Sequence, residues 1–177
     1  MHRSFRRVLG LAAGAVLACS AAHAQWTSDA SLNTLVAGGG GDQTVPIIKP
    51  TPDGGVWVFF YDNGAGTGYK PMAQRLSSGG VPQFPGNGVV LANRTNTATF
   101  TSDAEVDAAG NFYAVFDDNS SGSNRVTVQK VEPNGNLPWG AAGLDAANLA
   151  GSFGNRIAVC ADATIVVCGS VSNVLQF

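Results

Sequence analysis

Carboxylates are the side chains of this chain whose spacing comes nearest to that of a catalytic site. Asp103, Glu105 and Asp107 alternate along the sequence, which places all three on one face of a strand. Most glycoside hydrolases use a pair of carboxylates that flank the scissile bond. The segment borders a turn, however, so we interpret the three as a solvated acidic edge and expect no catalytic residue among them.

Asp62, Asp117 and Asp118 form a second pattern, in which acidic residues precede Asn63 and Asn119 in what we expect to be the same loop of two repeats. Oxygen ligands there could hold Ca²⁺, which would then raise the melting temperature. Neither loop has the spacing of a dedicated calcium site, so we interpret the aspartates as solvated caps that bond backbone amides. They are the candidate binding residues, and we expect no metal and no cofactor.

The mature chain lacks a histidine that could activate a nucleophile, because His2 and His23 both lie in the expected leader and there is no other histidine. A Ser-His-Asp triad and an imidazole-bound zinc ion are therefore excluded. We expect the chain not to be an enzyme.

The first 24 residues have the pattern of a secretory signal peptide. Three arginines precede an apolar run over 8–18 that is too short to span a bilayer, and Ala22-His23-Ala24 is a cleavage motif. We expect cleavage after Ala24 and a secreted or periplasmic mature protein. Cys19 offers the alternative of a lipid-anchored envelope assembly factor, since it ends a loose lipobox.

Without this leader the chain has seven basic and twelve acidic residues, a net charge near −5. Such a surface repels phosphate backbones, so nucleic acid is not an expected partner. No later segment approaches transmembrane length. Cys160 and Cys168 remain, and the expected hairpin through Asp162-Ala163 sets them apart along the strands and on opposite faces, so we expect two buried, unpaired thiols.

A unit of about 55 residues recurs along the chain. Its marks are an aromatic residue after a Gly-containing turn and a glutamine that closes an alternating run: Trp26, Phe84 and Trp139, and Gln74, Gln129 and Gln176. The hairpin over 53–62 also returns at 109–118. The aromatics could stack on a sugar, but we favour a place in the core.

Alternating apolar residues predict short strands separated by Gly, Asn and Pro turns. We expect strands over 56–61, 72–76, 104–106, 112–116, 126–131, 157–160 and 165–168, and a loop with a short strand over 141–149. Two of them, 56–61 and 112–116, are apolar on both faces, as in strands packed on two sides, whereas 125–131 has the pattern of a half-exposed strand. The predicted fold class is all-β, with four antiparallel strands per unit as in a propeller blade; a sandwich or a solenoid is the alternative.

The run from Gln74-Arg75-Leu76 through Gly79-Gly80 to Phe84, and its second copy from Gln129-Lys130-Val131 through Gly135 to Trp139, resemble the repeat of large secreted bacterial β-propeller-type proteins. The resemblance covers nearly all of 26–177. It implies a propeller-like architecture, and it implies little about activity because such proteins are mostly uncharacterised.

We therefore expect a signal peptide at 1–24 and a β-propeller-type region at 25–177 with two whole units and part of a third. This region would be a fragment of a longer propeller, or other copies of the chain would complete the propeller. The expected function is a secreted, non-catalytic binding or structural module, with a carbohydrate or a cell-surface protein as candidate partner. A lectin, or a sialidase-like enzyme with active residues outside this chain, is the alternative, because Asp53-Gly54-Gly55 before Trp57 is similar to an Asp-box. The arginines that a sialidase needs are scattered in the sequence: Arg75, Arg94, Arg125 and Arg156.

Overall fold

Eleven strands and no helix make up the part of the chain that this computed structural model describes, namely residues 29, 31, 33–64, 66, 68–97, 101–119, 125–147, 152–171 and 174–176. The strands are β1 (Gln43–Pro50), β2 (Val56–Asp62), β3 (Lys70–Leu76), β4 (Val89–Val90), β5 (Ser102–Val106), β6 (Phe112–Asp118), β7 (Arg125–Val131), β8 (Leu144–Ala147), β9 (Ser152–Val159), β10 (Ile165–Val171) and β11 (Val174–Gln176). The all-β prediction is confirmed. Nothing in this described part is a helix of the length and apolarity that crossing a membrane requires.

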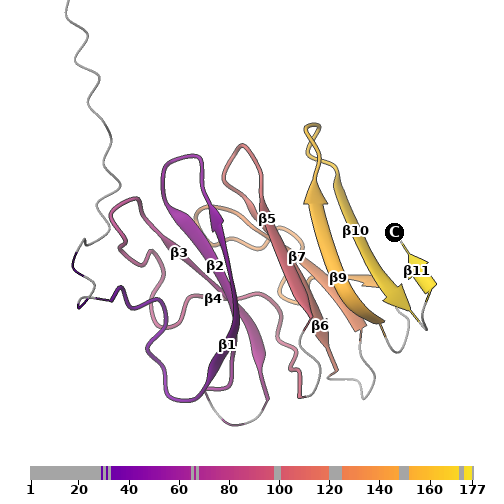
Figure 1. The fold of residues 1–177 in the computed structure, drawn as a ribbon, viewed down its shortest axis with the longest axis horizontal. Helices are drawn as coiled ribbons and strands as arrows, with labels where there is room; N and C mark the ends of the chain where they lie inside the picture. The colour runs from indigo at the N-terminus through magenta and orange to yellow at the C-terminus, as the bar shows by residue number, and fades with distance from the viewer. Residues whose placement is uncertain are drawn as a thin grey trace, which may run out of the picture.

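The strands form three antiparallel sheets that stand side by side in chain order (Figure 1). Two sheets have four strands each, in the orders β1-β2-β3-β4 and β5-β6-β7-β8, and the third has the order β11-β10-β9. The hairpins β1–β2, β5–β6 and β9–β10 all turn at the same end of the stack. The predicted strands all form, and the loop over 141–149 contains the short β8 as expected.

The two four-stranded sheets share their pairing register. Val56 lies opposite Leu76 in the first sheet, as Phe112 lies opposite Val131 in the second. Both pairings continue without a slip for seven residues to the ends of β2 and β6. Any residue of β2 or β3 therefore has a counterpart in β6 or β7 at the same place in its sheet.

One turn geometry joins the first two strands of every sheet. Its fourth residue has a positive φ and donates its N–H to the carbonyl of the first residue at 3.0 Å, in the pairs Thr51–Gly54, Asp107–Gly110 and Cys160–Ala163. Two of these positions are glycine, which adopts such a φ without strain. The third sheet has alanine there, at φ 63°.

Aromatic side chains fill the space between the first two sheets. Trp57 is fully buried and stacks between Phe84 and Phe112, with ring centroids 5.7 and 5.2 Å away. Its Nε1 donates a hydrogen bond to the carbonyl of Gly110 at 3.1 Å, so the indole also ties the two sheets together. The opposite face of β6 packs toward the third sheet.

The second interface is less aromatic. Its buried residues are Tyr113, Val115, Val126, Val128 and Ile157, and partly buried Trp139 packs against them. The expectation that the recurring aromatics belong to the core is confirmed for Phe84 and Trp139, which both pack against buried clusters. Trp26 lies outside the described residues, as do residues 1–24, the predicted signal peptide, which include Cys19.

The prediction that 125–131 is half exposed was wrong. Thr127 and Gln129, whose polar side chains suggested a solvated face, are fully buried. Gln129 Nε2 donates to the carbonyls of Leu91 and Gly140 at 2.7 and 2.8 Å, and its Oε1 accepts the N–H of Lys130. These bonds replace water, so a polar side chain can lie inside the stack.

Gln74 has the corresponding role in the first sheet. Its Nε2 donates to the carbonyl of Phe84 at 3.0 Å, and its Oε1 accepts the N–H of Phe84 at 3.1 Å. The recurring glutamine thus fastens the loop that carries the recurring aromatic onto the sheet. The side chain of Gln176 is outside the described part.

Cys160 and Cys168 are free thiols, but only one follows the predicted placement. Val159, and not Cys160, lies opposite Ile165. The pairing is shifted by one residue from the one expected, so Cys160 lies in the turn and is exposed. Cys168 is half-buried on β10.

Substitution of Gly88 by alanine tests how tightly the loop before β4 is packed. It has φ +101°, and a Cβ there would clash with the carbonyl oxygen of Ala73, whereas Gly86 has φ +60° and open space around it. We expect Gly88→Ala to lower the free energy of unfolding by roughly 3 kcal/mol and Gly86→Ala by about 1 kcal/mol, because only the first adds a clash to the left-handed strain. Urea denaturation followed by tryptophan fluorescence measures both, and equal losses would contradict the proposed clash.

Candidate functional site

Asp118, at the end of β6, is fully buried in an ion-pair network. Its Oδ2 lies 3.2 Å from Arg94 Nη1 and accepts a hydrogen bond from Thr127 Oγ1 at 2.8 Å. Its Oδ1 lies 3.3 Å from Arg125 Nη2. The expectation of a solvated cap is wrong for this residue, because two guanidinium groups and a hydroxyl take the place of water.

Asp145 on β8 completes the network. Its Oδ1 lies 2.5 Å from Arg94 Nη1 and its Oδ2 lies 3.8 Å from Arg125 Nη1. Burial alone would lower the pKa of Arg94, but its bonds to Asp145 and Asp118 outweigh burial and raise it. The arginines are scattered in the sequence, whereas the fold brings Arg94 and Arg125 together. The signal available in the sequence was the expected antiparallel pairing of these two strands, β6 and β7, which places Arg125 opposite Asp118.

Asp117 is the neighbouring residue and is also fully buried, but the groups around it are neutral donors. Its Oδ2 accepts hydrogen bonds from the N–H and Oγ1 of Thr101 at 3.1 and 2.6 Å, and its Oδ1 accepts one from Asn155 Nδ2. Burial raises the pKa of this carboxyl, and these donors offset only part of the rise. The expectation of a solvated cap is wrong here too, since β9 covers the site.

Asp62 occupies in the first sheet the place of Asp118 in the second, and its surroundings differ. It is half-buried and accepts hydrogen bonds from Gln43 Nε2 at 3.1 Å and Asn87 Nδ2 at 2.6 Å. It also borders a cavity of about 430 Å³. Of the three candidate binding residues, Asp62 alone is accessible to a ligand, because the other two are fully buried.

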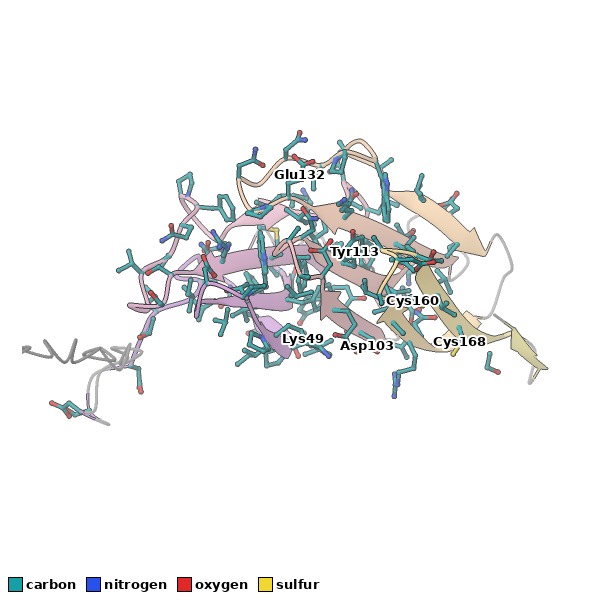
Figure 2. All side chains as sticks on the ribbon, turned by 90° about the horizontal axis from the view of Figure 1, so that it is seen from above. Lys49, Asp103, Tyr113, Glu132, Cys160 and Cys168 are labelled. Carbon is teal, nitrogen blue, oxygen red and sulfur yellow. The ribbon has the colours of Figure 1, made fainter. Side chains whose placement is uncertain are left out.

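The alternating acidic residues of β5 each have a partner. Glu105 Oε1 lies 2.9 Å from Lys49 Nζ on β1, and Asp103 Oδ2 accepts the N–H of Ile157 on β9 at 3.2 Å. Lys49 and Asp103 lie along one edge of the stack when it is seen from above (Figure 2). All three acidic residues are half-buried and do not form the solvated edge expected. Asp103 and Glu105 join neighbouring sheets, whereas Asp107 bonds residues of its own hairpin.

The hairpin aspartates stabilise turns. Asp53 Oδ1 accepts a bond from Thr51 Oγ1, and this bond together with Arg75, whose Nη2 is 2.5 Å from Asp53 Oδ2, lowers the pKa of Asp53. For Asp107, burial alone would raise the pKa, but bonds from Asn111 outweigh it and lower the pKa. Both residues fix a hairpin, and Asp107 also lines a cavity of about 520 Å³ between its own turn and the β9–β10 turn.

No three Asp, Glu, His or Cys side chains come together as a metal site within the described ranges. Comparison with known proteins adds nothing to this picture, because no family model, no curated protein and no solved structure matches the chain.

Removing the charge of Asp118 tests the buried network. We expect Asp118→Asn to lower the free energy of unfolding by about 3–5 kcal/mol, because Arg94 and Arg125 would lose their buried counter-charge. The control is Asp145→Asn, at a side chain that is 37% exposed, where we expect about 1 kcal/mol or less. Chemical denaturation of both variants gives the comparison, and similar losses would mean that the network is solvated.

The raised pKa of Asp117 makes stability depend on pH. A carboxyl with a higher pKa in the folded state stabilises the fold below its unfolded pKa, near 3.8, and this stabilisation is lost as the pH rises through the folded pKa. From about pH 4 to about pH 7, the wild type should therefore lose stability relative to Asp117→Asn, which does not titrate. Urea titrations across this range measure the difference, and parallel curves would show that the pKa of Asp117 is not raised.

Proposed function

We propose that this chain is a secreted, non-catalytic β-repeat protein of the propeller type, and that it acts as a binding or structural module at or outside the cell envelope. One observation carries the proposal: the sheets β1–β4 and β5–β8 have the same strand order, and their central pairs, β2–β3 and β6–β7, have the same register. A protein built by repeating one sheet would have this property, as propeller blades do.

The packing of the sheets supports the same proposal. β2 turns Trp57, Phe59 and Tyr61 toward the second sheet, where they meet a cluster that includes Phe112 and Phe116 of β6. The intervening residues of β6 belong to the cluster shared with the third sheet. The second sheet is thus apolar on both sides, which suits sheets arranged face to face in series.

The use of the charged groups supports a role without catalysis. The buried carboxylates and arginines bond to one another or to the backbone, and in doing so they join one strand or sheet to the next. Asp117 and Asp118 are fully buried, so a substrate would not reach these carboxylates in the folded protein. The exposed part of the molecule is left for contact with a partner.

Export and processing test the proposal. When the full sequence is expressed in a bacterium, we expect the mature protein outside the cytoplasm with Gln25 at its amino terminus, because residues 1–24 have the pattern of a cleaved leader. Mass spectrometry of the intact protein measures this. The purified protein should release no fluorophore from umbelliferyl glycosides, sialosides included.

The control for export is Cys19→Ala, which removes the competing acylation site and should leave the mature mass unchanged. Detection of an acylated Cys19 in the wild type would contradict the proposed secreted module and would indicate a lipid-anchored protein. Turnover of any glycoside would contradict the absence of catalysis.

A further inference from the structure

The cavity beside Asp62 differs from the equivalent place in the next sheet, and the difference points to a ligand. Its walls are Asp62, Lys70, Met72, Asn87 and Val90, with four glycines. Asp62 pairs with Lys70 as Asp118 pairs with Arg125. Met72 pairs with Val90, and its counterpart Thr127 pairs with Asp145. Asp62, Met72 and Val90 therefore lie at the same corner of the first sheet as Asp118, Thr127 and Asp145 do in the second, where the ends of the second, third and fourth strands meet.

The corner in the second sheet is filled by an arginine from the same chain. Arg94 lies in the segment that leads into β5, and its Nη1 is 3.2 Å from Asp118 Oδ2, 3.0 Å from Thr127 Oγ1 and 2.5 Å from Asp145 Oδ1. This corner of the sheet is therefore a guanidinium site, with the ligand supplied internally.

The corner in the first sheet receives no such side chain from any residue that the structure describes. The segment that leads into β1 is the glycine run 38–41, and two of these glycines donate backbone N–H groups to Asn87 Oδ1 at 3.1 and 2.9 Å. Asp62 accepts bonds from two neutral amides, and no lysine or arginine of the described residues lies within 4.0 Å of its carboxylate. The cavity thus keeps the carboxylate, and within the described part of the chain that carboxylate has no ion-pair partner, although Lys70 belongs to the wall.

The changes in the walls define what would fit. Met72 and Val90 replace the hydroxyl and the second carboxylate of the other corner, so two walls are apolar. An arginine side chain matches this arrangement, since its methylene stem can lie on apolar groups while its guanidinium meets the carboxylate. Lys70 does not exclude it, because Arg125 occupies the equivalent position beside Arg94.

We propose that the Asp62 cavity binds the arginine side chain of a protein partner, with the guanidinium at Asp62 and the stem against Met72 and Val90. This rests on the proposed binding role and names the chemistry that the partner presents. A partly exposed ion pair contributes little in water, and Lys70 in the cavity wall repels a second cation, so a single arginine should bind weakly, with a Kd of about 1 mM.

The test is an NMR titration of the ¹⁵N-labelled mature chain with Nα-acetyl-arginine methylamide. We expect saturable shifts at the amides of Gly39, Gly64, Gly68 and Gly86 and at the side-chain amide of Asn87. The probe Nα-acetyl-citrulline methylamide has nearly the same shape without the charge, and it should bind at least tenfold more weakly. Absence of saturable shifts with arginine, or equal shifts with citrulline, overturns the proposal.

Variants separate the site from general charge effects. Asp62→Asn should weaken arginine binding at least tenfold, whereas Asp162→Asn, which removes an exposed carboxylate from the β9–β10 turn, should leave it unchanged. Unshifted amides in β6 show that each variant is folded. Equal binding of arginine by the wild type and Asp62→Asn would overturn the proposal. That result would not affect the proposed function, which is tested by export and by the lack of glycoside turnover.

Discussion

Burial of apolar side chains between successive sheets is the constraint on which the rest of this structure depends. β2 and β6 are apolar on both faces, so neither sheet has a face suited to water. An aromatic residue such as Trp57 removes about 150–250 Å² from water, roughly 4–6 kcal/mol at most. That gain exists only while a neighbouring sheet is present, which makes the sheets dependent on one another for stability.

This arrangement forces polar groups into the interior, and each is held by specific partners. Strand ends, loops and turns must also pass between the sheets, and their backbone groups need bonds that water cannot supply. Gln74 and Gln129 bond loop backbone, and Asp117 bonds the segment before β5. Hydrogen bonds inside the stack therefore fix the position of each loop, and the apolar contacts fix the distance between sheets.

The sequence predicted most of the strands because these carry a local pattern of alternation and a turn of Gly, Asn or Asp, but β1 and β4 were not among the predicted ranges. It predicted burial poorly, as for Asp118 and Thr127, because burial depends on what packs across from a residue and not on its neighbours in the chain. The Arg94 network joins residues up to 51 positions apart, which no local pattern encodes. Cys160 was misplaced because the turn takes one residue more than expected.

The glutamine that fastens each loop also limits which residues could replace it. Gln129 uses its NH₂ group to reach two carbonyls and its oxygen to accept an N–H. Glutamate has the same size but no donor, so deamidation would set a negative oxygen against two carbonyl oxygens in a dry environment. Slow chemical ageing at this one atom would thus loosen a loop from its sheet, although the side chain would scarcely change shape.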